Sequence, residues 1–564
     1  MPAPITRRRL VLAGVLFASA PAAPVAAQQA RSTRLYYSDD ITHILTNLAP
    51  WRRNRETFSN ALIAASMDEA INAGVDHYVV QPGTGWVPWW RSSIYPADQH
   101  YRWFAETFGI RPSGFGRYMI EGGDVVAAAL AHARQRNVPL TVSVRLNDVH
   151  GIFYSGVTPQ QWRSSQDNRD IQPAMARNLE FISRVHMEHP EWRLDPSPPD
   201  YRNARSAAGR LWNWAVPDVV QYRASLLEEL VRTYALSGLE LDFMRFPAFF
   251  QQQFPMQARQ QVMRGFLTRI RSALGTGREM AVRVPLTLSG WGALGLAPAL
   301  LREAGVDRVT LSAHTFTSQD LDFAATREAL RGFRVAIEMG QGRHLRQYDM
   351  RAPAAERGPT EDYIVNCRPE DFLSTGQLAA AAGFEAVSMF NFVYYRQRAA
   401  ETVDFDPSRE PPWATLRALK QPGQAQMRAR SSFLGTVFPD GLPERSVPVD
   451  VPPGGAPLGL RLNVPAPARA SSGAGSLRLT LADRRSMRAP GADAAWQVML
   501  NGQALTPDNS GGRTTLAPDP PPGLAPQGWV VPQNLAKPGP NRLEIRQTGG
   551  DPTRLWQAEL YLPA

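Results

Sequence analysis

The chain has 564 residues, and 43% of them are hydrophobic, which is enough to build large cores in about two to four domains. The formal net charge is +10, yet the sequence contains neither a basic run nor a nucleic-acid-binding motif, so we expect no nucleic-acid partner. Cys367 is the single cysteine, which excludes an internal disulfide and a paired-cysteine metal site.

Residues 1–27 have the features of an export signal. Arg7–Arg9 precede a short apolar run, and Val25–Ala27 supply the small residues of a cleavage site. We therefore expect a twin-arginine signal peptide and a periplasmic or secreted protein. A membrane anchor is the alternative, but Pro21 and Pro24 leave the run too short to span a bilayer, and no other segment is long and apolar enough to do so.

Removing residues 1–27 takes away three arginines and no acidic residue, so the formal charge falls from +10 to +7. This excess is compatible with an anionic polysaccharide as substrate. However, most of the basic residues are arginines, and alanine, proline and glycine are abundant, so a general bias in composition explains the charge at least as well.

Between about residues 40 and 400, short apolar runs alternate with amphipathic helical patterns. The predicted strands are Ile44–Asn47, His77–Gln81, Leu140–Asn147, Gly238–Phe243, Ala281–Leu286, Arg308–His314, Arg334–Gly340 and Ala386–Phe392. The predicted helices include Asn60–Ala73, Val125–Arg136, Val219–Leu236, Gln257–Leu274 and Gln377–Ala382. This alternation predicts a (β/α)8 barrel over residues 35–425. A doubly wound open sheet is the rival, but Gly83-Thr84-Gly85 fits its phosphate loop poorly.

The strand that begins at Gly238 carries two carboxylates on one face. Because side chains alternate along a strand, Glu240 and Asp242 point one way and the apolar side chains between them point the other. Buried carboxylates are costly unless they are paired or used in chemistry. Asp242 also lies at the C-terminal end of its strand, where (β/α)8 barrels keep their catalytic groups.

The other predicted strands also end in polar residues, which indicates a polar pocket at one mouth of the barrel. We expect this pocket to bind substrate through Arg145, Asn147, Asp148, Glu240, Arg245, Arg283, His314 and Asn391. Aromatic residues in the neighbouring loops suit the apolar faces of sugar rings, and we expect Trp86, Trp89, Trp214 and Tyr394 to contribute. Ordinary packing within the loops is the alternative for each of these rings.

The residue types present exclude several classes of enzyme. We find no His-Glu-x-x-His motif, no cluster of His and Cys, and no Gly-x-Ser-x-Gly elbow, so we expect neither a metal or other cofactor nor a serine hydrolase. Glycoside hydrolysis needs two carboxyl groups, one as acid and one as nucleophile or base. The fourth and seventh strands lie roughly across a barrel mouth, which makes Asp242 and Glu338 the natural pair.

Two motifs resemble those of a known family. Gly238-Leu-Glu-Leu-Asp-Phe-Met-Arg-Phe-Pro247 resembles the fourth-strand motif of bacterial family-10-like glycosyl hydrolases, and Ser143-Val-Arg-Leu-Asn-Asp-Val-His150 is similar to their third-strand motif. The resemblance covers roughly residues 40–400. It implies a (β/α)8 barrel that acts on glycans, with Asp242 as a catalytic carboxylate. It also implies sugar-binding or orienting roles for Arg145, Asn147 and Asp148.

The predicted reaction is hydrolysis of glycosidic bonds in a poly- or oligosaccharide. Asp242 would be the general acid/base, with its pKa raised by Glu240 and burial, and Glu338 would be the nucleophile of a retaining enzyme, which we favour over an inverting one. Arg145 or Arg283 could keep one carboxylate ionised, and Glu240 would pair with one of these arginines. A non-catalytic glycan-binding barrel, or a transglycosylase or lyase acting on the same glycans, is the alternative.

The composition changes after residue 400. Short alternating runs separated by turn signals predict a jelly-roll-like β-sandwich over residues 430–564, with strands at Leu458–Val464, Ser476–Leu481, Trp496–Leu500, Gly528–Val531, Asn541–Gln547 and Leu555–Leu562. We expect an accessory domain. It is either purely structural or binds sugar through Trp496 and Trp529.

Overall fold

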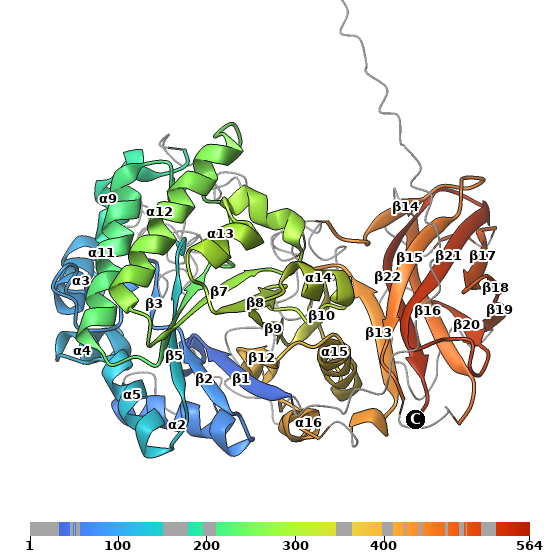
Figure 1. Cartoon of the computed structure of the whole chain (residues 1–564), viewed down its shortest axis with the longest axis horizontal. Coiled ribbons are helices and arrows are strands. Elements are labelled where there is room, and N and C mark those ends of the chain that lie inside the picture. The colour runs from blue at the N-terminus through green and yellow to red at the C-terminus, as the bar shows by residue number, and fades with distance from the viewer. Residues whose placement is uncertain are drawn as a thin grey trace, which may run out of the picture.

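The computed structural model is a (β/α)8 barrel followed by a β-sandwich, as the sequence predicts (Figure 1). The structure describes residues 33–45, 49, 51, 57–149, 179–195, 210–345, 364–396, 410–421, 425–437, 442, 444–467, 472–483, 490–491, 493–508 and 526–564. The predicted signal peptide and His150 lie outside these residues. None of the helices within them is long and apolar enough to cross a bilayer.

Eight parallel strands close the barrel in the order β1-β12-β9-β8-β7-β6-β5-β2. Their bounds are β1 Arg34–Asp39, β2 His77–Val80, β5 Leu140–Arg145, β6 Gly238–Asp242, β7 Glu279–Pro285, β8 Arg308–Ser312, β9 Arg334–Met339 and β12 Ala386–Phe390. Seven of the predicted strands therefore overlap a barrel strand, as their patterns of buried apolar residues indicate.

The first predicted strand is wrong. Ile44 lies in the short helix α1 (Thr42–Leu45), and the strand that opens the barrel is Arg34–Asp39. This segment pairs in parallel with both β12 and β2, which closes the barrel. Its last residue, Asp39, is a buried carboxylate that accepts hydrogen bonds from Ser66 (2.8 Å) and Tyr78 (2.5 Å). These partners come from distant segments, so local patterning did not reveal the strand.

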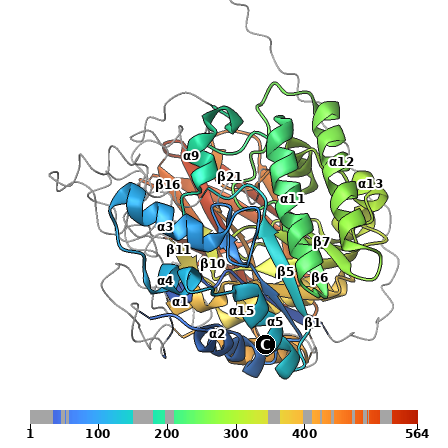
Figure 2. The ribbon, with the colours of Figure 1, turned by 90° about the vertical axis from the view of Figure 1, so that its left-hand side faces the viewer.

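Helices surround the barrel on the outside, and α11 and α12 lie side by side there (Figure 2). The α-helices between the strands are α2 Asn60–Asn72, α3 Ala97–Phe108, α4 Gly114–Ile120, α5 Val125–Gln135, α9 Arg184–Glu188, α11 Pro217–Thr233, α12 Met256–Leu274, α13 Pro298–Glu303, α14 Phe323–Ala329 and α15 Pro369–Ala381. The helix α16 (Trp413–Leu419) follows the last barrel strand. The residues that the structure describes also include three 3-10 helices, η1 Pro190–Trp192, η2 Leu288–Leu294 and η5 Phe392–Arg396. Their apolar faces pack on the strands and form one large core.

Short strands interrupt two of the loops. They form two small two-stranded sheets, β3 Gly83–Thr84 with β4 Val87–Pro88, and β10 Gly342–Leu345 with β11 Ile364–Asn366. The second of these follows β9 directly, so β10 carries the chain from the barrel mouth toward the sandwich.

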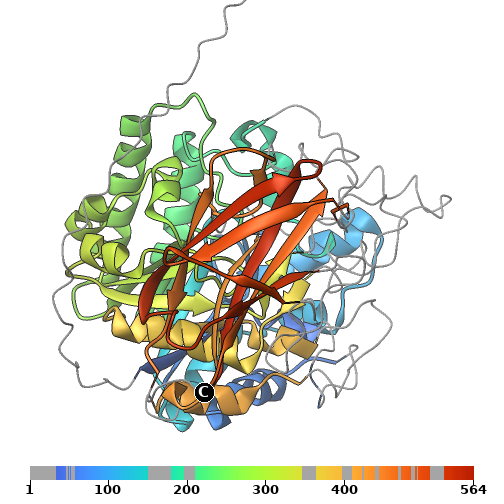
Figure 3. The ribbon, with the colours of Figure 1, turned by 90° about the vertical axis from the view of Figure 1, so that its right-hand side faces the viewer.

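The sandwich consists of two antiparallel sheets with a core of their own, and Figure 3 shows its strands in front of the barrel. One sheet contains β13 Arg430–Gly435, β14 Val449–Val451, β16 Gly475–Asp483, β19 Thr506–Asp508, β20 Gln527–Val531 and β22 Thr553–Leu562. The other contains β15 Leu458–Val464, β17 Ala495–Leu500, β18 Gln503–Ala504 and β21 Gly539–Gly549. All six predicted strands overlap one of these.

Candidate active site

Three neighbouring strands place opposite charges side by side at the C-terminal mouth of the barrel. Asp242 ends β6, and its register partners are Arg145 at the end of β5 and Arg283 on β7. All three side chains are buried. Because parallel strands keep their register partners on one level, the sequence order of these strands produces an Arg-Asp-Arg row.

Arg283 joins the two carboxylates that the sequence singles out. Its Nη1 donates to both carboxylate oxygens of Asp242 (3.0 Å each), while its Nε and Nη2 donate to Glu338 (2.8 and 2.5 Å). The donors of one guanidinium form a rigid planar fork, so the bonded oxygens of the two carboxylates lie within roughly 8 Å of each other. An upper limit of this size is compatible with the separations of about 5–9.5 Å at which two carboxyl groups hydrolyse a glycosidic bond.

Glu338 has a further donor and a raised pKa. Ser312, at the end of β8, donates to Glu338 (2.6 Å) and accepts a hydrogen bond from Arg283 (3.1 Å). Burial raises the pKa of Glu338, while the charge of Arg283 opposes this shift without cancelling it. A carboxyl group with a raised pKa is suited to give up a proton as a general acid.

The guanidinium itself stays charged. Burial alone would lower the pKa of Arg283, but Asp242 and Glu338 outweigh it and raise that pKa far above its ordinary value. The guanidinium carbon also lies 4.4 Å from the ring centre of Phe390, the last residue of β12. Arg283 is therefore held on three sides by β6, β9 and β12.

Arg145 organises the other half of the mouth. It donates to Asp40 (2.5 Å) and to Gln81 (3.0 Å), and its Nη1 lies 3.6 Å from Asp148. Although burial opposes the shift, the charge of Arg145 holds the pKa of Asp40 well below its usual range. Asp40 directly follows β1. Sequence reasoning missed it because that strand was assigned to the wrong segment.

Glu240 lies one level deeper, as its position on the strand predicts, but its partner differs from the expected ones. Its carboxylate accepts from Arg308 (3.1 Å), Ser143 (2.9 Å) and Thr310 (3.0 Å). Neither Arg145 nor Arg283 donates to it among the described residues. Arg308, at the start of β8, extends its side chain into the barrel interior below the mouth. The sequence pattern of a single strand does not show such a contact between strands.

Two predicted sugar-binding side chains bond to the protein's own groups. The Asn147 amide donates to the carbonyls of Phe246 (3.2 Å) and Ala248 (2.7 Å) and accepts from the backbone of Trp212 (3.1 Å). Asn391 accepts from the backbone of Asp40 (3.1 Å). Both amides brace loops at the mouth, which fits an orienting role better than direct contact with a sugar.

Two of the remaining candidates meet at the rim. Arg245 is half-buried and donates to Nε2 of His314 (2.7 Å), and its guanidinium lies 4.6 Å from the ring centre of Phe246. Tyr394 is half-buried and hydrogen-bonded to Thr42.

The backbone at this end of the barrel is strained. Five non-glycine residues after barrel strands have positive φ angles: Ile41 (52°), Trp86 (65°), Phe246 (54°), His314 (62°) and Asn391 (44°). Such backbone is costly for L-residues and concentrates at functional sites.

The tryptophans do not form an exposed sugar platform, so this prediction is wrong. Trp86, Trp89 and Trp214 are at most 2% exposed. Trp86 stacks on Trp212 with ring centres 4.0 Å apart, and its indole donates to the carbonyl of Leu146 (2.9 Å). These rings are part of the same hydrophobic core as the barrel strands and helices. Among the residues that the structure describes, no three His, Cys, Asp or Glu side chains gather to hold a metal ion.

No protein-family model matches the chain, and no curated protein matches it in sequence. Solved structures with a similar fold include the endo-beta-1,4-mannanase from Thermotoga petrophila, at 11% identity and a TM-score of 0.37, over 94% of this chain and 98% of that one. Alpha-L-fucosidase isoenzyme 2 from Paenibacillus thiaminolyticus has 11% identity and a TM-score of 0.39, over 71% of this chain and 51% of that one. A cycloisomaltooligosaccharide glucanotransferase from Paenibacillus sp. has 11% identity and a TM-score of 0.31, over 95% of this chain and 58% of that one.

The chain thus spans little more than half the length of the fucosidase and the glucanotransferase. At these identities and TM-scores, the similarities carry no conclusion about reaction or substrate.

Proposed function

We propose that this protein is a glycoside hydrolase that cleaves glycosidic bonds in a poly- or oligosaccharide. The observation that carries the proposal is the single buried Arg283, which holds Asp242 and Glu338 together at the C-terminal mouth of the barrel. Two carboxyl groups at this separation, one of them with a raised pKa, are what the two-carboxylate mechanism requires.

The raised pKa supports a change in the roles expected from the sequence. Glu338 is the general acid: it gives its proton to the glycosidic oxygen as the bond to the anomeric carbon breaks. Asp242 is the nucleophile and forms a bond to that carbon. Water then displaces Asp242, and the proton that the water loses returns to Glu338. Arg283 donates to both carboxylate oxygens of Asp242 and so orients this side chain for the attack.

We propose that the reaction retains the anomeric configuration. Arg283 brings the two carboxylates together on one guanidinium, and the retaining geometry is the one with the shorter carboxyl separation. Residues 1–27 have the pattern of an export signal, so a substrate outside the cytoplasm fits the proposal. An anionic polysaccharide remains one candidate within this class.

A second candidate function is glycan binding without turnover. The burial of the pair favours it, because Asp242 is fully buried and Glu338 is 2% exposed. Both carboxylates are also bonded to Arg283, as they would be in an ion-pair network that only stabilises the barrel.

Product analysis separates the two functions. The full chain is incubated with neutral and anionic polysaccharides from bacteria and algae, and the products are identified by mass spectrometry and by proton NMR of the newly formed anomeric centre. We expect shortened oligosaccharides whose first anomer matches the substrate. Binding measured by calorimetry without any product would establish the second function instead, and the opposite anomer would contradict retention alone.

A further inference from the structure

The loops that follow β8 and β9 are fastened to each other just beyond the catalytic pair. Thr317 donates from its backbone to the carbonyl of Gly342 (2.6 Å) and from its side chain to the carbonyl of Gly340 (2.8 Å). Gly340 lies so close to the backbone of Thr315 that a methyl group there would overlap it. Because Ser312 and Glu338 are themselves hydrogen-bonded, the two loops and their polar residues form one unit.

The sandwich holds the β9 loop through a buried ion pair. Arg343, on β10, is 1% exposed, pairs with Glu559 of β22 and donates to the hydroxyl of Tyr561 (2.9 Å). Arg478 of β16 pairs with the same carboxylate (2.6 Å). Gly435 of β13 packs directly on the carbonyl oxygen of Arg343, where a methyl group would overlap it.

The sandwich also holds the β8 loop. The side chain of Gln319 accepts from the backbone of Phe433 (3.1 Å) and donates to the carbonyl of Ser431 (3.2 Å). Asn463 donates to the carbonyls of Gln319 (3.0 Å) and Leu321 (2.9 Å).

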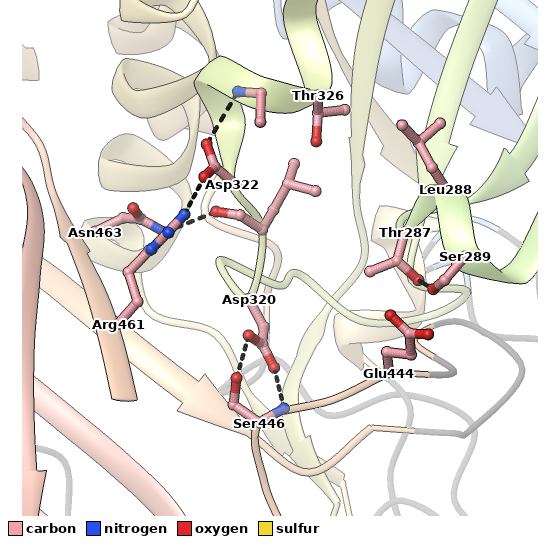
Figure 4. A pocket seen from close by; sticks show the side chains of 12 residues that line it. Thr287, Leu288, Ser289, Asp320, Asp322, Thr326, Glu444, Ser446, Arg461 and Asn463 are labelled. Carbon is pink, nitrogen blue, oxygen red and sulfur yellow. Dashed lines mark hydrogen bonds and ion pairs between the residues drawn. The ribbon is translucent and has the colours of Figure 1, made fainter. Parts of the chain in front are cut away.

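Figure 4 shows the edge of this junction, where a cavity of about 370 Å³ lies between the domains. Asp320 accepts hydrogen bonds from Ser446, and Asp322 pairs with Arg461 across it. These side chains bond across the domain boundary, so this edge too fastens the β8 loop to the sandwich.

We infer that the β-sandwich positions Glu338, with Arg343 as the positioning residue that Glu559 anchors. Only Met339–Gly342 separate Arg343 from Glu338, and the turn at Gly340 is too crowded to absorb a shift. A displacement of β10 therefore moves the carboxylate relative to Asp242. The importance of this effect for turnover rests on the proposed function, while the mechanical coupling does not.

Two glycines of the same sandwich supply a matched test. Gly435→Ala inserts a methyl group against the backbone of Arg343, whereas Gly459→Ala, on β15, inserts one into open space. Hydrogen exchange followed by mass spectrometry measures the backbone of residues 334–345, and the peptide that contains β5 serves as an internal reference. We expect faster exchange at 334–345 in the Gly435 variant alone. Equal exchange in both variants would overturn the inference.

Turnover gives a second measurement. We expect kcat of Gly435→Ala to fall roughly 10- to 100-fold with KM unchanged, because a small misplacement of a reacting group slows chemistry more than it weakens binding. Gly459→Ala should keep the wild-type values. If the wild type cleaves no glycan, the proposed function fails and exchange alone decides the positioning.

Arg343→Lys is the variant to test if Gly435→Ala does not fold. Lysine keeps a charge for Glu559 but lacks the guanidinium fork that also reaches Tyr561. We expect the rate of hydrogen exchange at residues 334–345 in Arg343→Lys to lie between the rates in the wild type and in Arg343→Met. If the Lys and Met variants both exchange at the wild-type rate, the sandwich does not position Glu338.

Discussion

Arg283 and Glu338 lie on β7 and β9, and the guanidinium reaches past β8 to bond the carboxylate through Nε (2.8 Å) and Nη2 (2.5 Å). The remaining donor, Nη1, holds Asp242 on the other side. One side chain thus bonds both proposed catalytic groups.

Removing the guanidinium should destabilise the fold strongly. Arg283→Met leaves two buried carboxylates without their cation, and we expect the free energy of unfolding to fall by about 3–5 kcal/mol. The control is Arg331→Met, because Arg331 pairs with Glu328 and both side chains are exposed. Its loss should be about 0–1 kcal/mol. Urea unfolding of both variants measures the difference, and equal midpoints would show that Arg283 does not stabilise the mouth.

The role of Glu338 as acid predicts a dependence on the leaving group. Glu338→Gln cannot supply the proton, so kcat on an unactivated glycan should fall by roughly 10²–10⁴-fold. Aryl glycosides with good leaving groups need little protonation, so their first step should be affected far less. Rates across a series of aryl leaving groups test this. A uniform loss across the series would assign the acid role to another group.

The buried pair of Asp39 and His43 predicts how stability depends on pH. Its nitrogen and oxygen lie 3.3 Å apart. Burial alone would lower the pKa of His43 and raise that of Asp39, but the mutual attraction wins, so the pKa of His43 is raised above 6.5 and that of Asp39 is lowered below 3.8. Both shifts contribute stability in the range between those two ordinary values.

The contribution of His43 is lost as pH rises through its raised pKa, and that of Asp39 is lost as pH falls through its lowered pKa. Melting temperatures of the wild type should therefore decline on the alkaline side of this range. His43→Gln should be less stable near pH 5 and should lack the part of the alkaline decline that comes from this residue. Parallel curves for the two proteins would show that the pair does not govern the decline.

The burial of the tryptophans predicts a loss of stability instead of a loss of substrate affinity. Trp89 is fully buried, and its ring centre lies 4.8 Å from that of Phe115. Trp89→Ala should lower the free energy of unfolding by about 3–5 kcal/mol, as truncation of a buried aromatic residue usually does. The fraction that folds should keep the wild-type KM. A raised KM in a stable variant would restore the sugar-contact role expected from the sequence.

The sequence was sufficient to predict the barrel because seven of its eight strands carry a local signature. Gly238–Asp242 shows a run of buried apolar residues with its acid at the end, and its position at the mouth follows from the parallel order. Arg34–Asp39 has no such signature, and two of the partners that satisfy Asp39, Ser66 and Tyr78, come from segments far away in the chain. With that strand misplaced, Asp40 was overlooked.

Side-chain pairing at the site depends on tertiary register, which local patterns do not contain. Arg283 was expected to hold one carboxylate but holds two. Glu240 pairs with Arg308, the first residue of β8, which lies two strands away and on the same level. Burial raises the pKa of Glu338, and the extent of burial depends on tertiary packing that a local sequence pattern does not contain.

The rate of glycan cleavage by Asp242→Asn tests the central proposal most directly. This variant keeps the shape of the side chain but removes the negative charge that would attack the anomeric carbon. Glu328→Gln, an exposed carboxylate on α14, is the matched control. On the polysaccharide that the wild type cleaves best, we predict that Asp242→Asn loses roughly three orders of magnitude in kcat or more while the control keeps its activity. Unchanged turnover by Asp242→Asn would contradict the proposed active site.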